Sequence, residues 1–254
     1  ALRQFEAMDK LLAEKHDEIC AVVVEPLIQC AGGMRMHHPI YHTKLREACD
    51  RYGVHLIADE IAVGFGRTGT LFACEQSGIT PDFMCLSKGL TAGYLPLSVV
   101  LTTDNVYNAF YDDYETMRAF LHSHSYTGNP IGCAVALATL DIFRDENVIE
   151  NNRQLSRCMA ESVAHLADHP NVGDIRQHGM TMAIEMVKDK ASKTPFPWQE
   201  RRGIRVYKHS LTRQALLRPL GNVLYFMPPY VITEEQIRHL AQVATEGIEI
   251  AVKD

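Results

Sequence analysis

Several features that would assign this chain of 254 residues to other protein classes are missing from it. No apolar run approaches the roughly 20 residues that a membrane-spanning helix needs. Positive charge is in deficit, and a formal net charge of −6 gives no reason to expect nucleic acid or an acidic membrane as partner. The seven cysteines are irregularly spaced and include no Cys-x-x-Cys pair, which predicts free thiols in a reducing compartment. The composition therefore favours a cytoplasmic enzyme.

The chain also lacks an initiator methionine and a signal-like segment, and Ala1 leads directly into a predicted helix. We interpret it as a fragment whose N-terminal portion is missing. Its length still allows one large domain or two. A hydrophobic content of 46% with 22% charged residues is ordinary for a globular protein, and no internal repeat is visible.

Apolar runs and helical periodicity alternate in the first 145 residues. Four runs predict strands, at 19–24, 54–58, 82–86 and 97–102. Helices are predicted over residues 2–16, 39–52 and 131–144, the second with Pro39 near its start and Gly53 just past its end. Strands separated by helices predict an α/β fold with a mainly parallel sheet. In such sheets, ligands bind beyond the carboxyl ends of the strands.

The pattern changes in the last third of the chain. Residues 175–186 alternate between apolar and smaller or polar residues, as in a half-exposed strand. Two short strands are predicted at 216–217 and 223–227. Helices are predicted over 148–168 and 204–215, and a capping box, Thr233-Glu-Glu-Gln236, opens a last one. We place a domain boundary near residue 145, so that residues 1–145 belong to a large domain and 146–254 form a smaller α+β domain.

Three charged residues stand where predicted strands end. Glu25 follows the first strand, Asp59 the second, and Lys88, 29 residues after Asp59, the third. A lysine and an aspartate at neighbouring strand ends are what pyridoxal phosphate chemistry requires, because the lysine forms a Schiff base and the carboxylate holds a proton on the pyridine nitrogen. Taken singly, the lysine is better explained as a surface residue after a strand, and the aspartate can be explained as a cap of the following loop.

Four stretches make the pattern specific: Val24-Glu25-Pro26, Leu56-Ile-Ala-Asp59-Glu60-Ile61, Gly64-Phe-Gly-Arg67-Thr68-Gly69 and Leu86-Ser-Lys88-Gly89. With their spacing they resemble the class III (ω-type) pyridoxal-phosphate-dependent aminotransferases, which are fold type I enzymes. The resemblance runs along the whole chain. It implies pyridoxal 5'-phosphate as cofactor, a two-step ping-pong transamination, and a homodimer with shared active sites.

Residues 120–130 and 217–230 narrow the resemblance to one branch of the class. That branch aminates 8-amino-7-oxononanoate to 7,8-diaminononanoate in biotin biosynthesis, usually with S-adenosylmethionine as donor. Ala62 also fits this branch, because ornithine and 4-aminobutyrate aminotransferases usually carry Gln there. The donor stays open between S-adenosylmethionine and lysine, since the Gly93-Tyr94-Leu95-Pro96 segment also occurs in relatives thought to use lysine.

The resemblance implies a role for each matching residue. Lys88 and Asp59 become the catalytic pair and the anchors of the cofactor, and Ile61 packs against its ring, where an apolar residue is as easily plain core. His124 and Ser125 reach the cofactor phosphate from the neighbouring subunit, although many members carry Pro-Thr at these positions. The residues implied to bind substrate are Ser123, Arg218, Tyr225 and Glu25.

Two of these residues also have an explanation that involves no substrate. Arg218 suits bidentate binding of a substrate carboxylate, but without the resemblance it would be an exposed arginine between two strands. Glu25 is equally explained by an ion pair, with Arg67 as a candidate partner. Pairs of histidines occur at 37–38, 122–124 and 165–169, but no third ligand is evident beside them, so we expect no metal site.

Three alternative functions remain. The nearest is another class III aminotransferase that acts on a different ω-amine. The second is a protein that binds pyridoxal phosphate without catalysis. The third, a nucleotide-binding dehydrogenase, is disfavoured by the expectation that no Gly-x-Gly-x-x-Gly follows a strand.

Overall fold

The computed structural model describes residues 1–253, which form two compact units. The first unit consists of residues 1–27, 37–65 and 70–147. The second begins at residue 148 and also contains two short segments from earlier in the chain, 28–36 and 66–69. One boundary in the sequence does not separate the two units, because segments 28–36 and 66–69 already belong to the second unit, whose main part starts at residue 148.

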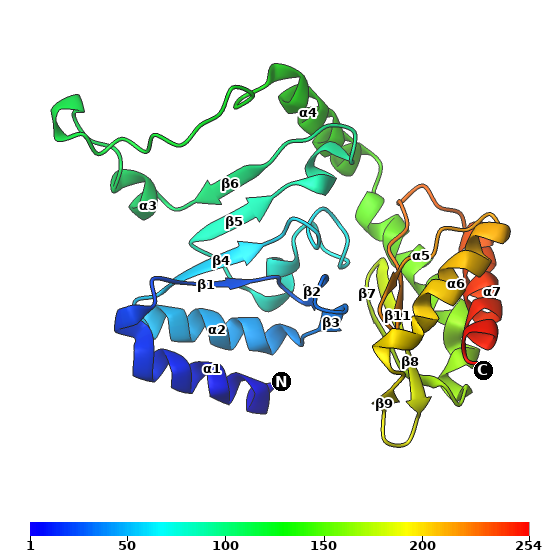
Figure 1. Ribbon diagram of the computed structural model, residues 1–254. Helices are drawn as coiled ribbons and strands as arrows, with labels where there is room; N and C mark the ends of the chain where they lie inside the picture. Colours follow the sequence, from blue (N-terminus) through cyan, green and yellow to red (C-terminus); the bar gives the residue numbers. More distant parts are fainter. Residues whose placement is uncertain (254) are drawn as a thin grey trace. The chain divides into compact units, whose positions relative to one another are not determined.

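A four-stranded sheet in the order β1-β4-β5-β6 forms the centre of the first unit (Figure 1). Strands β1 (Ala21–Val24), β4 (His55–Asp59) and β5 (Phe83–Leu86) are parallel, and β6 (Val99–Thr102) is antiparallel to β5. The prediction of four strands in a mainly parallel sheet is therefore confirmed. β6 runs the other way because no crossover helix separates it from β5, and only a crossover can return the chain for a parallel neighbour.

Two helices, α1 (Leu2–Lys15) and α2 (Pro39–Tyr52), pack against each other and cover one face of this sheet. The predicted end signals of α2 are confirmed, since Pro39 lies in its first turn and Gly53 adopts a left-handed conformation with φ +68°. Between helices and sheet lies a core that includes Leu12, Leu45 and Leu56, all 0–1% exposed. Amphipathic helices of ordinary length thus cover the sheet on this side.

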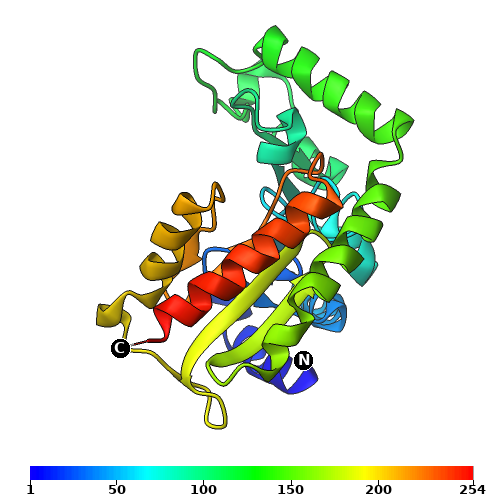
Figure 2. The same cartoon turned by 90° about the vertical axis from the view of Figure 1, so that its right-hand side faces the viewer.

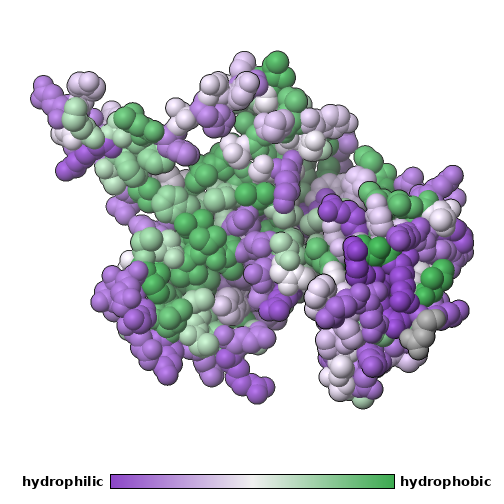
Figure 3. All heavy atoms as spheres, viewed as in Figure 1, coloured by the Kyte–Doolittle hydropathy of each residue, from purple (hydrophilic) through white to green (hydrophobic). Residues whose placement is uncertain are grey.

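The opposite face of the sheet is not covered within the first unit. Val23 and Val100 belong to this face by register and are 66% and 59% exposed. Figure 3 shows apolar side chains gathered over these strands. Parallel sheets usually have both faces covered, so this face is available to further polypeptide.

Apolar exposure continues beyond β6, through α3 (Asp104–Asn108) and the irregular segment 109–129 to α4 (Pro130–Asp145). The large exposed side chains there are Tyr107, Phe110, Tyr111, Tyr114, Met117, Phe120, Leu121, Tyr126, Ile131, Leu137, Leu140 and Ile142. Monomeric proteins rarely expose contiguous apolar surface of this kind.

The second unit is built on an antiparallel sheet in the order β10-β11-β8-β7, with β9 paired to β8. Its main strands are β7 (Val172–His178), β8 (Thr181–Asp189) and β11 (Val223–Phe226). The prediction of one half-exposed strand over 175–186 is wrong, because this region is a hairpin whose second strand is buried on both faces. Thr181 and Ala183, at the alternate positions, are 0% exposed. The small side chains at these positions predict exposure from the sequence, but in the structure they allow neighbouring elements to pack closely against β8.

Three helices complete the second unit: α5 (Val148–Val163), α6 (Arg202–Thr212) and α7 (Glu234–Ala251). Figure 2 shows α7 and α5 side by side in front of the sheet. The predicted capping box is confirmed, since the Thr233 hydroxyl accepts from the Gln236 amide at 3.2 Å and the Gln236 side chain accepts from the Thr233 amide at 2.9 Å. The helix predicted to reach residue 168 changes after Val163 into a 3-10 helix.

The remaining elements are short. They are the strands β2 (Ile28–Gln29), β3 (Arg35–Met36), β9 (Thr194–Pro195) and β10 (Pro219–Leu220), and the 3-10 helices η1 (His16–Glu18), η2 (Ala73–Ser77), η3 (Lys88–Thr91), η4 (Tyr114–Thr116), η5 (Ala164–Asp168) and η6 (Trp198–Glu200). Among residues 1–253, no helix has the length and apolarity needed to cross a membrane. None of the seven cysteines, all of which lie in this range, forms a disulfide.

One close approach in the second unit gives a testable prediction. A Cβ added to Gly203 in α6 would lie 2.2 Å from the Gly221 carbonyl oxygen and 2.6 Å from the Pro219 Cβ, in the turn that follows Arg218. Gly203→Ala should therefore destabilise the full-length protein by about 1–3 kcal/mol, the usual cost of overpacking. Denaturant unfolding followed by circular dichroism measures the change.

Gly132→Ala in α4 is the matched control, since its added Cβ meets only Leu97, at 3.7 Å or more. Alanine is the better helix former, so this variant should be neutral or slightly more stable. Equal destabilisation by the two substitutions would contradict the packing argument.

Candidate active site

The carboxyl ends of the parallel strands bring three charged residues to one edge of the first sheet. β1 and β4 pair with Val24 opposite Ala58, so Glu25 and Asp59 occupy equivalent positions just beyond. β4 and β5 pair with Asp59 opposite Cys85, and Lys88 follows β5 by two residues. The sheet register therefore brings Glu25, Asp59 and Lys88 to the same edge, where α/β sheets bind ligands.

Asp59 is half-buried and, by strand alternation, belongs to the face of the sheet that α1 and α2 do not cover. Its Oδ1 accepts a hydrogen bond from the Ile61 amide at 3.0 Å. This bond, from a residue two positions on, fixes the orientation of the carboxylate. Within the first unit as described, it is the only hydrogen bond of this side chain, so Oδ2 is available to a ligand. Ile61 is half-buried beside it.

Lys88 opens η3 with its side chain exposed, and its backbone is left-handed, with φ +42°. Such a conformation costs a non-glycine residue about 1–2 kcal/mol. Hydrogen bonds secure the turn, since the Leu90 amide donates to the Ser87 carbonyl at 3.0 Å and the Gly93 amide donates to the Lys88 carbonyl at 3.1 Å. Among residues 1–253 the Lys88 amine forms no ion pair, so it can react with a bound group.

Glu60, next to Asp59, has a different function. It is 0% exposed, and its carboxylate accepts hydrogen bonds from the Ala73 and Cys74 amides at 2.9 and 2.7 Å. Burial raises the pKa of the Glu60 carboxyl, and these two hydrogen bonds oppose that rise. Glu60 therefore holds the start of η2 in place, a role that no pattern in the sequence indicated.

The segment predicted to meet the cofactor phosphate lies between η4 and α4, and Ser123, His124 and Ser125 in it are exposed. The His124 amide donates to the Thr127 hydroxyl at 3.0 Å, and its ring nitrogen accepts from the Tyr126 amide at 3.2 Å. No hydrogen bond joins these three residues to Asp59 or Lys88 in the part of the first unit that the structure describes. Their assignment stays a prediction that depends on a neighbouring subunit.

The residues predicted to hold substrate in the small domain lie in the second unit. Arg218 is exposed just before β10, and among the described residues it forms no ion pair. Its guanidinium can therefore receive a carboxylate. Tyr225 is half-buried in β11, opposite Ala183 of β8.

Arg67 is held by contacts within the second unit. Its guanidinium donates to the Pro228 carbonyl at 2.7 Å and lies 4.5 Å from the centre of the Tyr230 ring. Burial lowers the pKa of this guanidinium. The pairing of Arg67 with Glu25 stays a prediction.

The glycine-rich loop after β4 contradicts one expectation, that no Gly-x-Gly-x-x-Gly sequence follows a strand. Gly64-Phe65-Gly66-Arg67-Thr68-Gly69 does match Gly-x-Gly-x-x-Gly, and it follows β4 after four residues. The expectation that no such sequence follows a strand was therefore wrong. The loop nevertheless lacks the context of a dinucleotide site, since residues 60–103, all described, contain no α-helix for it to open.

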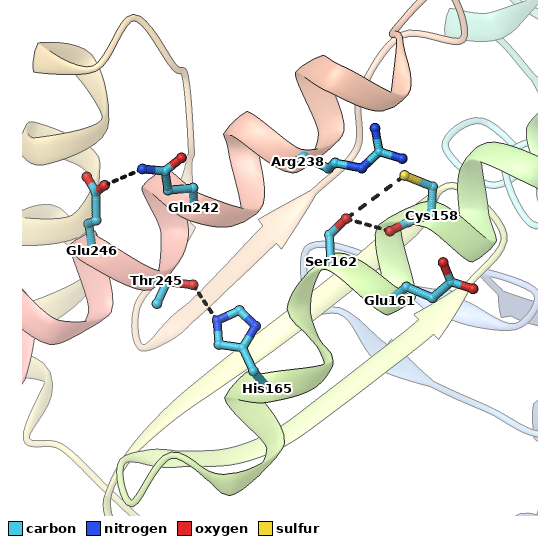
Figure 4. A pocket seen from close by; sticks show the side chains of 8 residues that line it. All are labelled: Cys158, Glu161, Ser162, His165, Arg238, Gln242, Thr245 and Glu246. Carbon is cyan, nitrogen blue, oxygen red and sulfur yellow. Dashed lines mark hydrogen bonds between the residues drawn. The ribbon is translucent and has the colours of Figure 1, made fainter.

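A groove of about 450 Å³ in the second unit lies between α5 and α7 (Figure 4). Its polar side chains bind one another, as in the pair His165–Thr245 at 2.9 Å. None of the predicted site residues lines it. The lining residues are Cys158, Glu161, Ser162, His165, Arg238, Gln242, Thr245 and Glu246. Residues 1–253 contain no cluster of three or more His, Cys, Asp or Glu suited to a metal ion.

Comparison with known proteins gives a consistent result. The family model described as "Aminotransferase class-III" matches residues 1–247. A Geobacter sulfurreducens protein named adenosylmethionine-8-amino-7-oxononanoate aminotransferase is 45% identical over 96% of this chain and 53% of its own length. A Helicobacter pylori protein of the same name is 47% identical over 91% of this chain and 52% of its own. The chain thus spans about half the length of these relatives.

Solved structures give the same picture. The Methanocaldococcus jannaschii protein with this name superposes with a TM-score of 0.93 at 39% identity, over 96% of this chain and 57% of its own. An (S)-enantioselective ω-transaminase from Thermomicrobium roseum superposes with a TM-score of 0.91 at 31% identity, over 99% of this chain and 56% of its own.

The buried Glu60 predicts a pH effect on stability. Its pKa is raised in the folded protein above the value of about 4.3 that an unfolded chain gives. The stability that Glu60 contributes is therefore largest below about pH 4.3 and falls as the pH rises through the folded pKa. Glu60→Gln removes this fall, so its melting temperature relative to the unmodified protein should increase from about pH 4.5 to about pH 7.5.

Glu6→Gln is the control, because Glu6 is exposed in α1 and does not contribute to the raised pKa of Glu60. Scanning calorimetry of the full-length protein at both pH values compares the variants. A relative melting temperature of Glu60→Gln that does not change with pH would contradict the prediction.

Proposed function

The chain belongs to the class III aminotransferase family, and we propose that it forms part of a pyridoxal-phosphate-dependent enzyme that aminates 8-amino-7-oxononanoate to 7,8-diaminononanoate in biotin biosynthesis. Its fold is that of the type I transaminases, with a mainly parallel sheet. The observation that carries the proposal is the shared sheet edge of Asp59 and Lys88. The names of the relatives supply the substrate.

The two residues fit the cofactor chemically. Bound pyridoxal phosphate supplies an aldehyde that condenses with amines and a ring that accepts electrons. Lys88, with an exposed amine, would bond to the aldehyde carbon and later carry the proton between substrate and cofactor. The free oxygen of Asp59 would accept a charge-assisted hydrogen bond from the ring nitrogen, a contact worth about 1.5–3 kcal/mol. Ile61 would pack against the ring.

The domain assignments follow from the same proposal. Residues 1–145 are proposed as part of the cofactor-binding large domain and residues 146–254 as the small domain. Arg218 would bind the carboxylate of the oxononanoate, with Tyr225 and Glu25 on the substrate side. A donor carrying its own α-carboxylate would also suit Arg218, so S-adenosylmethionine and lysine both remain candidate donors.

We further propose a homodimer with shared active sites, working in the cytoplasm. The uncovered face of the sheet and the exposed apolar side chains from Tyr107 to Ile142 support a partner subunit. In this arrangement Ser125 and His124 would donate to the phosphate of the partner's cofactor, and Ser123 would lie near its substrate. The cytoplasm suits seven cysteines without a disulfide.

A second candidate is an ω-transaminase that acts on another amine. The likeness to the Thermomicrobium roseum enzyme supports it. The lower identity of that match favours the first candidate.

The full-length protein should convert 8-amino-7-oxononanoate to the diamine when supplied with one of the two donors. Mass spectrometry of the products, with S-adenosylmethionine and lysine supplied in separate reactions, measures this conversion. Lys88→Ala should form no diamine, because it lacks the amine that bonds to the cofactor.

Acceptor preference separates the two candidates. Higher turnover with pyruvate or 2-oxoglutarate than with the oxononanoate would overturn the first candidate in favour of the second. Absence of turnover together with borohydride labelling of Lys88 by pyridoxal phosphate would indicate a binding protein without catalysis.

The 254 residues alone should be inactive or nearly so. By resemblance, a Gly-Ser phosphate contact and an aromatic side chain stacked on the cofactor come from residues outside this sequence. The isolated chain and the full-length protein can be compared in the same diamine assay. Measurable turnover by the isolated chain would contradict this prediction.

A further inference from the structure

The backbone of Lys88 is strained, so contacts with its surroundings must keep it in this conformation. Lys88 has φ +42° and Ala92, at the end of the same turn, has φ +50°. Left-handed residues other than glycine persist only where their surroundings determine the conformation. The hydrogen bonds of the turn connect residues within 87–97 and do not fix the turn to the rest of the unit.

The contact closest to Lys88 that ties the turn to the rest of the unit is made by Gly89 and Phe65. A Cβ added to Gly89 would lie 2.8 Å from the Phe65 Cβ and 3.0 Å from its Cδ2. The backbone directly after Lys88 therefore rests on the phenylalanine side chain, and only glycine permits this approach. Phe65 comes from the loop after β4 and is 23 residues away in sequence from Lys88.

Phe65 itself is firmly held. It is 2% exposed and belongs to a buried cluster with Leu86, Leu90 and Ala136. Leu86 lies two residues before Lys88 and Leu90 two residues after it, so the turn packs into the cluster on both sides of the lysine. The Phe65 ring also contacts the Phe143 ring of α4, with centroids 6.4 Å apart.

The loop that carries Phe65 begins directly after Asp59, the second residue proposed to hold the cofactor. The Gly64 amide donates to the Glu60 carbonyl at 2.9 Å, and the buried Glu60 carboxylate holds η2. Residues 59–65 thus form a short rigid connection from Asp59 to the side chain under Gly89. Through this connection, the position of Lys88 depends on the position of Asp59.

We propose that Phe65 is a positioning residue for Lys88, acting through Gly89 to aim the lysine amine at the cofactor. The inference rests on the proposed function of Lys88 and adds a residue that touches neither cofactor nor substrate. Misplacement of a reacting group by about 1 Å costs up to about a hundredfold in rate, so a small shift of the turn would be measurable.

The test uses full-length protein freed of cofactor and then mixed with pyridoxal phosphate. Absorbance follows the covalent bond to Lys88, and borohydride reduction with peptide mapping identifies the residue. Phe65→Ala removes the Cγ and Cδ2 atoms on which the backbone of Gly89 rests, and Gly89→Ala adds the methyl group that Phe65 excludes. Both should slow formation of the bond about tenfold or more and shift the pH midpoint of its absorbance. Both should also lower kcat more than they change KM.

Phe143→Ala is the matched control, since it removes a ring that packs against the same cluster without touching Gly89. It should lower the melting temperature by less than Phe65→Ala, because Phe143 is only half-buried, and leave the rate of bond formation within about twofold. If Phe65→Ala and Gly89→Ala react like this control, the inference is overturned and the proposed function stands. If the unmodified protein forms no bond at Lys88, the proposed function fails, and the inference with it.

Discussion

The site depends on the parallel pairing of β4 with β5, which brings Asp59 opposite Cys85 and the lysine turn just beyond it. Because side chains alternate along a strand, a shift of one residue would turn Asp59 toward the covered face. The core fixes this register, since Leu56 and Ala58 are fully buried on the covered face and cannot exchange places with their neighbours. Packing on one side of the sheet thereby determines the chemistry on the other.

Two adjacent carboxylates illustrate how position decides function. Asp59 keeps one oxygen available at the sheet edge, whereas Glu60 gives both of its oxygens to the backbone of η2. One is suited to a ligand and the other to holding the loop in which Phe65 lies. The same division separates Arg218, exposed with no ion pair among the described residues, from Arg67, which is half-buried against the Tyr230 ring.

Local signals made much of this predictable. The ends of α2, the capping box of α7 and the strand ends that carry Glu25, Asp59 and Lys88 all depend on residues close together in the sequence. The direction of β6, the burial of β8 and the place of residues 28–36 and 66–69 in the second unit depend on distant partners. The contact between Phe65 and Gly89 could not be predicted from the sequence either, because neither residue type indicates which distant residue it touches.

The way the chain is divided has an evolutionary consequence. It passes from one unit to the other after residues 27, 36, 65, 69 and 147. A unit joined to its neighbour by one linker can be exchanged between genes as a whole, but the second unit cannot, because segments 28–36 and 66–69 of it are encoded between the strands of the first. New substrate preferences in such a protein must arise by substitution in place rather than by recombination of whole modules.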